Sequence, residues 1–260
     1  MANIQKEEND VNEMPIEENI KIFKKLNPNI NIDENKLQSD IDNIYKEYQK
    51  IKIDYNYNKD IINHEENKED DNEIDYFLIS KMIYFNKKYF NFIPRKIQIL
   101  SLIYFIKKNI KCGLIQQINT GEGKSTIIAF LAVYIAIKKN KKIDILTSSS
   151  VLAKRDSLLY KKFYNSFNLK VDYTYDHNEE AKENNHEYTN NPYNCYKADI
   201  VYGDTLSFEG DILRTYFMGI RGRGKERMFD CIIIDEIDNI AIDNLKIQQN
   251  YLIVFMDINF

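Results

Sequence analysis

The chain has 260 residues, with 36 basic and 40 acidic side chains and a formal net charge of −4 at pH 7. A chain without basic excess is poorly suited to grip many nucleic-acid phosphates, so composition disfavours nucleic acid as a partner. The apolar fraction of 43% allows a sizeable core, yet no apolar run is long enough for a transmembrane segment. The acidic, polar N-terminus is not typical of a secretory signal, so we expect none. Three cysteines without metal-site spacing indicate a reducing compartment, and we expect a cytoplasmic protein.

The N-terminal part of the chain differs in composition from the rest. Residues 1–75 are rich in Asn, Asp, Glu and Lys, and we predict a partly disordered, low-complexity extension to a domain formed by residues 76–260. Within it, residues 1–35 have few adjacent apolar residues and are expected to be flexible. Apolar positions recur at helical spacing over 36–57 and predict a helix. The charged stretch 58–72 is typical of a linker.

From residue 76 onward, apolar segments of helical and strand character alternate. In chain order, we predict a helix at 76–92, a helix at 98–106, a strand at 113–118, a helix at 126–137, a strand at 142–147, a helix at 151–167, a strand at 169–174, a polar loop or hairpin at 176–195, a strand at 198–203, a helix at 205–218 and a strand at 228–234. Strands that alternate with helices of ten or more residues predict an α/β fold, a mostly parallel sheet with helices on both faces.

The junction between the strand at 113–118 and the helix at 126–137 has the features of a phosphate-binding loop. It reads Thr120-Gly121-Glu122-Gly123-Lys124-Ser125. A glycine-bearing turn at this position aims backbone N–H groups and the positive end of the helix dipole at one point. Lys124 can there reach the β- and γ-phosphates of a nucleotide, and the Ser125 hydroxyl can bind Mg²⁺. The match is incomplete, because the strict pattern has glycine where Ile118 stands.

A pair of carboxylates follows the strand predicted at 228–234. This nearly continuous apolar run is typical of a strand covered on both faces, and it ends in Asp235-Glu236. Ligands of open α/β sheets bind at the carboxyl ends of the strands. Asp235 can hold Mg²⁺ there, and Glu236 can polarise the attacking water. The alternative is a strand that simply leads into a solvated acidic loop.

Four blocks of the sequence resemble the first ATPase lobe of the SecA family, the motor that drives preproteins through the Sec channel. The resemblance covers about residues 92–245, and the blocks occur in the family's order. In chain order they are Thr120-Gly121-Glu122-Gly123-Lys124-Ser125 (TGEGKT), Thr147 with Leu152-Ala153-Lys154-Arg155-Asp156 (T…LAxRD), Tyr202-Gly203 with Phe208, Asp211 and Leu213-Arg214 (YGTNxxxGxDxLR), and Asp235-Glu236-Ile237-Asp238 (DEVD).

The resemblance implies a RecA-like P-loop NTPase lobe that uses ATP and Mg²⁺. It also implies a set of site residues. The implied nucleotide contacts are Gln98 as adenine reader and Thr120, Gly121, Glu122, Gly123, Lys124, Ser125 and Thr126; the implied metal ligands are Ser125 and Asp235; the implied catalytic residues are Glu236, Lys124 and Asp235. A glutamine near a helix start can equally be a surface residue. Arg155 and Asp156 can lie at a lobe interface or form a helix-surface pair, and the role of Arg214 is equally open.

The chain also departs from the family pattern. Asp204-Thr205-Leu206 replaces the family's Thr-Asn-Asn, and whether the lobe is complete at its C-terminus stays open. The family's second lobe supplies an arginine that stabilises transferred charge, so we expect this chain alone to bind ATP better than it hydrolyses it. By resemblance, the partners are a preprotein or a Sec-type channel, with peripheral membrane association. Two alternatives remain: a DEAD-box-like helicase lobe, and a non-catalytic nucleotide-binding interaction module.

Overall fold

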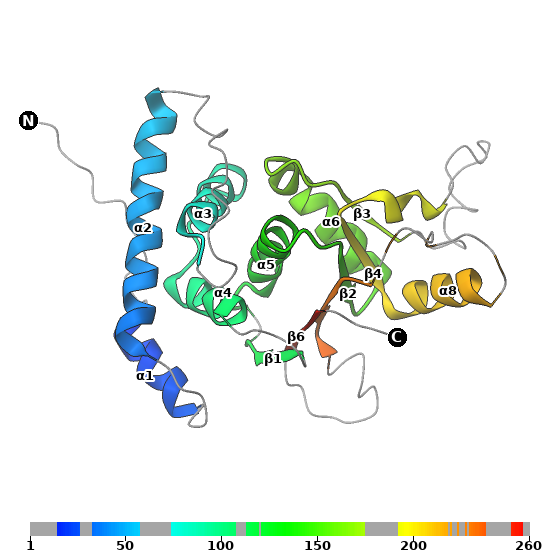
Figure 1. Ribbon diagram of the computed structural model, residues 1–260, viewed down its shortest axis with the longest axis horizontal. Helices are drawn as coiled ribbons and strands as arrows, with labels where there is room; N and C mark the ends of the chain where they lie inside the picture. Colours follow the sequence, from blue (N-terminus) through cyan, green and yellow to red (C-terminus); the bar gives the residue numbers. More distant parts are fainter. Residues whose placement is uncertain are drawn as a thin grey trace, which may run out of the picture.

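The computed structural model describes residues 15–26, 33–57, 74–107, 113–119, 121–174, 192–217, 219, 223, 227, 229–237 and 251–256, the last of these by backbone alone. Its helices are α1 (Ile16–Leu26), α2 (Glu34–Tyr57), α3 (Tyr76–Phe90), α4 (Lys96–Lys107), α5 (Lys124–Lys138), α6 (Ser150–Asn165), the 3-10 helix η2 (Pro192–Lys197) and α8 (Thr205–Tyr216). Its strands are β1 (Leu114–Gln117), β2 (Ile143–Thr147), β3 (Val171–Tyr173), β4 (Ile200–Asp204), β5 (Cys231–Asp235) and β6 (Tyr251–Met256) (Figure 1). Over these ranges, no helix combines the length and apolar character needed to cross a membrane.

The strands form one sheet in the order β1-β6-β5-β2-β4-β3. The four strands β5, β2, β4 and β3 are paired in parallel. β6 pairs antiparallel with both β5 and β1, so β1 points in the same direction as the parallel strands. The predicted mostly parallel sheet is therefore confirmed. β6, which the sequence analysis did not predict, separates β1 from β5.

Helices cover both faces of the sheet, as predicted. Side chains of β2 alternate between the faces because successive Cβ atoms of a strand point in opposite directions. Ile143 and Ile145 lie in the main hydrophobic core with residues of α5 and α6. Leu146 lies in a second, smaller core with Phe208 of α8 and Tyr196 of η2. Figure 1 shows α8 on the far side of the sheet from α5.

Two N-terminal helices pack against the α/β unit. α2, which confirms the helix predicted at 36–57, buries its apolar face against α3 in the main core. The contact is reinforced by polar groups: the Tyr76 hydroxyl donates to Asp40 at 2.6 Å, Lys107 forms an ion pair with Asp40, and Ser80 donates to the Ile44 carbonyl at 2.7 Å. The described helices on either side of residue 75 therefore share one hydrophobic core.

The first helix, α1, lies in the stretch that the sequence analysis expected to be flexible. Ile16 and Ile20 are buried in the main core, and Phe23 packs against it. These residues recur at i, i+4 and i+7, the spacing of one helix face. Glu17 and Glu18 in the first turn and lysines in the last turn also suit the helix dipole. The expectation of flexibility was wrong for these residues. It was based on the scarcity of adjacent apolar residues, whereas one helix face needs apolar residues only at this wider spacing.

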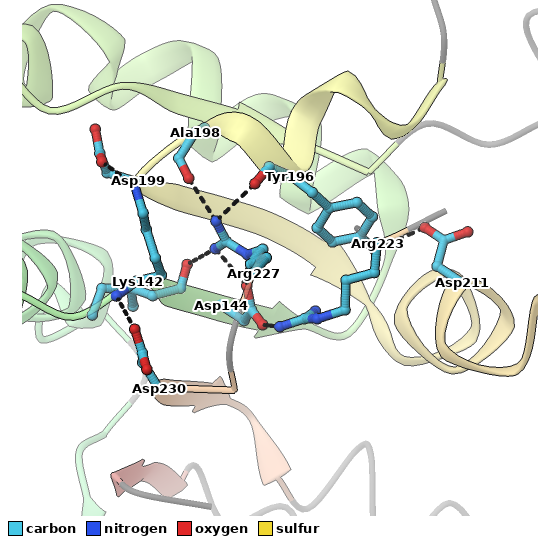
Figure 2. A network of polar contacts seen from close by, with 10 residues as sticks. Lys142, Asp144, Tyr196, Ala198, Asp199, Asp211, Arg223, Arg227 and Asp230 are labelled. Atoms are coloured by element: carbon cyan, nitrogen blue, oxygen red, sulfur yellow. Dashed lines mark hydrogen bonds and ion pairs between the residues drawn. The ribbon is translucent and has the colours of Figure 1, made fainter. Parts of the chain in front are cut away.

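A buried charge cluster fills the α8 side of the sheet beside the smaller core. Asp144 of β2 accepts hydrogen bonds from Arg227 at 2.7 and 3.1 Å and forms an ion pair with Arg223. Both guanidinium groups are almost fully buried, and Arg223 lies 4.1 Å from the Phe229 ring centroid. Arg227 also donates to the Ala198 carbonyl. Figure 2 shows that these side chains join the segment before β5 to β2 and to the residues just before β4.

Candidate functional site

The loop between β1 and α5 is shaped by its glycines. Gly121 and Gly123 have φ of 82° and 78°, a left-handed conformation that favours glycine. The Glu122 N–H donates to the Asn119 carbonyl at 3.2 Å and closes a turn. Gly123 is the N-cap of α5 and provides no side-chain cap, so the first N–H groups of the helix suit an anion. Thr120 lies outside the described residues.

Lys124 and the acidic pair lie together, although they are far apart in the sequence. The Lys124 Nζ is 3.8 Å from Asp235 Oδ1 and 3.6 Å from Glu236 Oε1. Nζ of Lys124 and Oδ1 of Asp235 are buried, and neither has a hydrogen-bond partner among the described residues. Nζ of Lys124 is therefore available to contact phosphate oxygens, and Oδ1 of Asp235 is available to contact a cation bound with them. The structure thus places the glycine loop and the carboxyl end of β5 at one site.

Glu236 has an unusual backbone for a residue with a side chain. Its φ of 57° lies in the left-handed region, which costs a non-glycine residue on the order of 1 kcal/mol and is concentrated at functional sites. The turn follows directly after β5 and keeps the Glu236 carboxylate beside Lys124. The Ser148 hydroxyl, at the end of β2, donates to Glu236 Oε2 at 3.3 Å. Sequence reasoning missed Ser148, because only the pairing of β2 with β5 brings it here.

Burial raises the pKa of the Asp235 carboxyl from 3.8 to about 6. The positive charge of Lys124 opposes this shift, while the negative charges of Glu236 and Asp156 add to it. The folded chain therefore holds this proton more tightly than the unfolded chain. The stabilisation that protonation provides is fully present below about pH 3.8 and is lost as the pH rises through about 6.

A test of this shift uses Asp235→Asn, which resembles the protonated carboxyl in shape and charge. At pH 7.5, without nucleotide and with a chelator, we expect the variant to unfold a few degrees above the unmodified chain, because the buried charge is gone. The difference should narrow as the pH falls toward 5, and it closes fully only below about pH 3.8. Asp42→Asn, on the exposed face of α2, is the control and should show no such trend. A difference that does not change with pH would contradict the raised pKa.

The remaining predicted nucleotide contacts are placed in different ways. Gln98 is buried rather than on the surface, and its amide Nε2 donates to the Glu122 carbonyl at 2.8 Å. Ser125 is partly buried in the first turn of α5, next to Lys124. The Thr126 hydroxyl lies in a buried contact with the Tyr160 hydroxyl of α6 at 3.2 Å. The structure brings Gln98 to the loop, and the roles of all three residues in nucleotide binding stay predictions.

Arg155 and Asp156 form an ion pair at 2.7 Å on α6, with Arg155 exposed and Asp156 buried. The hydrogen bond that Arg155 donates to Asp156 raises the pKa of Arg155, and the nearby charges of Asp156, Asp235 and Glu236 raise it further. The pair therefore belongs to the electrostatic surroundings of the site.

Arg214 lies elsewhere. It pairs with Asp211 within α8 at 2.9 Å, and Asp211 also accepts a hydrogen bond from the Tyr196 hydroxyl at 2.7 Å. The sequence left the role of Arg214 open, and the structure shows this residue in an ion pair within α8.

A glycine loop that opens a buried helix, with a lysine facing two carboxylates at the end of a parallel strand, defines the class of P-loop NTPase lobes with a RecA-like α/β fold. Comparison with known families narrows the class. The model of the SecA DEAD-like domain matches residues 3–249. The chain belongs to the SecA DEAD-like domain family.

Individual relatives agree with the family match. The chain is 34% identical over 136 residues to the protein translocase subunit SecA of Wolbachia sp. subsp. Brugia malayi (strain TRS). It is 32% identical over 136 residues to that of Campylobacter concisus (strain 13826), and 33% identical over 134 residues to that of Ehrlichia chaffeensis (strain ATCC CRL-10679 / Arkansas). In each case the aligned region is 52% of this chain and 14% of the relative. The chain thus matches a small part of these longer proteins.

Proposed function

We propose that the chain is the ATP-binding lobe of a SecA-like protein translocase motor. The observation that carries this proposal is the placement of Lys124 Nζ within 4 Å of both Asp235 and Glu236 at the start of α5. A lysine so placed can neutralise phosphate charge, while the two carboxylates serve a metal and a water. The family match supports the same function and favours it over a helicase lobe.

The described residues fit Mg²⁺ bound together with a nucleotide. Ser125 and Asp235 would hold the ion, which would neutralise charge on the phosphate oxygens. Among the described residues, no three His, Cys, Asp or Glu side chains are grouped to hold a metal by themselves. Mg²⁺ characteristically takes one or two protein oxygens and completes its shell with phosphate and water. The buried, unpartnered Oδ1 of Asp235 suits this role.

We assign each residue a separate role on the basis of its position. Lys124 and the N–H groups at the start of α5 bind the phosphates, and Glu236 accepts the proton of the attacking water. Ser148 positions the Glu236 carboxylate by its hydrogen bond. Coupling of hydrolysis to protein transport, with a preprotein or Sec-type channel as partner and peripheral association with a membrane, is proposed from the relatives' name, protein translocase subunit SecA.

Lys124→Ala directly tests whether Lys124 binds the phosphates of the nucleotide. ATP affinity is expected to fall about tenfold or more, because a charge-assisted contact to the phosphates is lost. Calorimetry or a fluorescent ATP analogue would measure the change, with thermal unfolding as a check that the variant folds. Lys161→Ala, which removes an exposed lysine from α6, is the matched control and should bind ATP normally. Unchanged ATP affinity in Lys124→Ala would refute the proposal that this residue binds the phosphates.

A further inference from the structure

Three side chains form a closed ring of polar contacts between the start of α4 and the phosphate loop. The Gln98 Oε1 accepts a hydrogen bond from the Arg95 backbone N–H at 2.8 Å. The Gln98 Nε2 donates to the Glu122 carbonyl at 2.8 Å. The circuit is closed by an ion pair between the Arg95 guanidinium and the Glu122 carboxylate. Helix α4 is thereby joined to the loop through both the backbone and the side chain of Glu122.

The ring packs tightly against Gly123. A Cβ on Gly123 would overlap the amide nitrogen of Gln98, and the glycine's φ of 78° also favours the absence of a side chain. Gln98 itself is only 6% exposed. Movement of the loop away from its present position would therefore break the Gln98 contacts. These contacts within the chain hold the loop in its described position.

The composition of the chain makes the arginine in this ring informative. The sequence has 30 lysines and six arginines. Each of the five arginines that the structure describes is bound to a carboxylate. Arginine differs from lysine in offering a planar fork that fixes the direction of its hydrogen bonds. In a chain that otherwise uses lysine, Arg95 marks a place where the orientation of the paired carboxylate matters.

The ring also fixes the orientation of the Gln98 amide. Its oxygen faces the Arg95 N–H and its nitrogen faces the Glu122 carbonyl. An amide keeps a second N–H and a second lone pair after making these bonds. The remaining N–H of Gln98 and the remaining lone pair of its oxygen offer a donor beside an acceptor. This arrangement matches the adenine edge, which presents N7 as an acceptor and the N6 amino group as a donor, whereas guanine presents two acceptors there. Gln98 is the residue predicted to read adenine, so any residue that holds this amide in place is expected to influence the choice of base.

We infer that Arg95 is a positioning residue for nucleotide recognition, acting through Glu122 and Gln98 on the phosphate loop and on the preference for adenine. This inference rests on the proposed ATP-binding function. Arg95 need not touch the nucleotide. Its effect comes from holding Glu122, whose backbone carries the loop and fixes the Gln98 amide.

Binding measurements on four variants test the inference. Arg95→Ala and Glu122→Ala should each weaken ATP binding about fivefold, the upper end of what a partly exposed ion pair contributes, and lower the preference for ATP over GTP by a similar factor. The double variant should be no weaker than either single variant, because both remove the same pair. The charge-swapped variant with Arg95→Glu and Glu122→Arg should recover part of the affinity. Independent, additive losses or an unchanged preference for ATP would overturn the inference.

Hydrogen exchange in the nucleotide-free chain separates this inference from the proposed function. The N–H groups of Glu122, Thr126 and Ile127 donate to the Asn119 and Gly123 carbonyls. Their exchange should accelerate severalfold in Arg95→Ala and Glu122→Ala, but not in Lys161→Ala. If the unmodified chain binds neither ATP nor GTP, the proposed function fails. Unchanged exchange would instead refute the positioning role of Arg95.

Discussion

Replacing Glu236 with glutamine is expected to leave ATP bound but unhydrolysed. The amide has the size of the carboxylate and can still accept a hydrogen bond from Ser148, which now donates to Glu236 at 3.3 Å. It cannot take a proton from water. Loss of a general base costs about 10²–10⁴-fold in rate. Single-turnover hydrolysis, with protein in excess over ATP, would measure the rate, while ATP affinity should stay within about twofold because the phosphate contacts of Lys124 remain.

The matched control for this variant is Glu209→Gln, which removes a carboxylate from the exposed surface of α8. Its hydrolysis rate should equal that of the unmodified chain. Hydrolysis by Glu236→Gln within tenfold of the unmodified rate would remove Glu236 as the base. Loss of ATP binding together with hydrolysis would instead indicate that Glu236 holds the loop or Lys124 in place.

Asp144→Ala is expected to have the largest effect on stability. Asp144 is the carboxylate that pairs with two guanidinium groups, which are almost fully buried between β2, η2 and the segment before β5 (Figure 2). Removing one partner of a buried ion pair leaves uncompensated charge and costs about 3–5 kcal/mol. Arg227 would keep its contacts to backbone carbonyls, including that of Ala198, but Arg223 would lose its carboxylate. Urea unfolding followed by circular dichroism would show the loss as a lower midpoint.

The control is Glu47→Ala, since Glu47 forms an exposed pair with Lys50 on α2 at 2.5 Å. Exposed pairs contribute only about 0–1 kcal/mol, so the urea midpoint should hardly change. A loss in Asp144→Ala as small as that of the control would show that water or the surrounding carbonyls compensate the two arginines. The cluster would then contribute little to the stability of the fold.

Most elements of the α/β unit could be predicted because their apolar periodicity is strong. The buried β2 and the apolar α5 were predicted to within two residues at each end. Three elements were missed: α1, β6 and the 3-10 helix η2, which begins inside the stretch predicted as a polar loop or hairpin and is too short to show an apolar period. The apolar residues of α1 are dispersed among charged residues, and the helix gains its stability from the core that α2 and α4 provide. The apolar run of β6 has no pattern that indicates an antiparallel position between β1 and β5.

The residues of the candidate site likewise include some that the sequence identified and some that it did not. Lys124 and Asp235 were identified by their positions at the ends of predicted elements, where parallel sheets bind ligands. Ser148 and Arg95 were not, because their relevance depends on contacts with residues distant in the chain. The available signal was that the chain has 30 lysines and six arginines, one of which is Arg95. This signal became informative only when the structure showed that Arg95 pairs with Glu122.

The sequence by itself determined the strand-loop-helix order, the glycines of the loop and the carboxylates after β5, because local periodicity and turn chemistry act over a few residues. The tertiary structure alone decided which of these groups meet. It set the 3.6–3.8 Å approach of Lys124 to the acidic pair, raised the pKa of Asp235 through burial, and joined Arg95 to the phosphate loop. Such properties depend on distance and desolvation, which arise only when remote segments pack together.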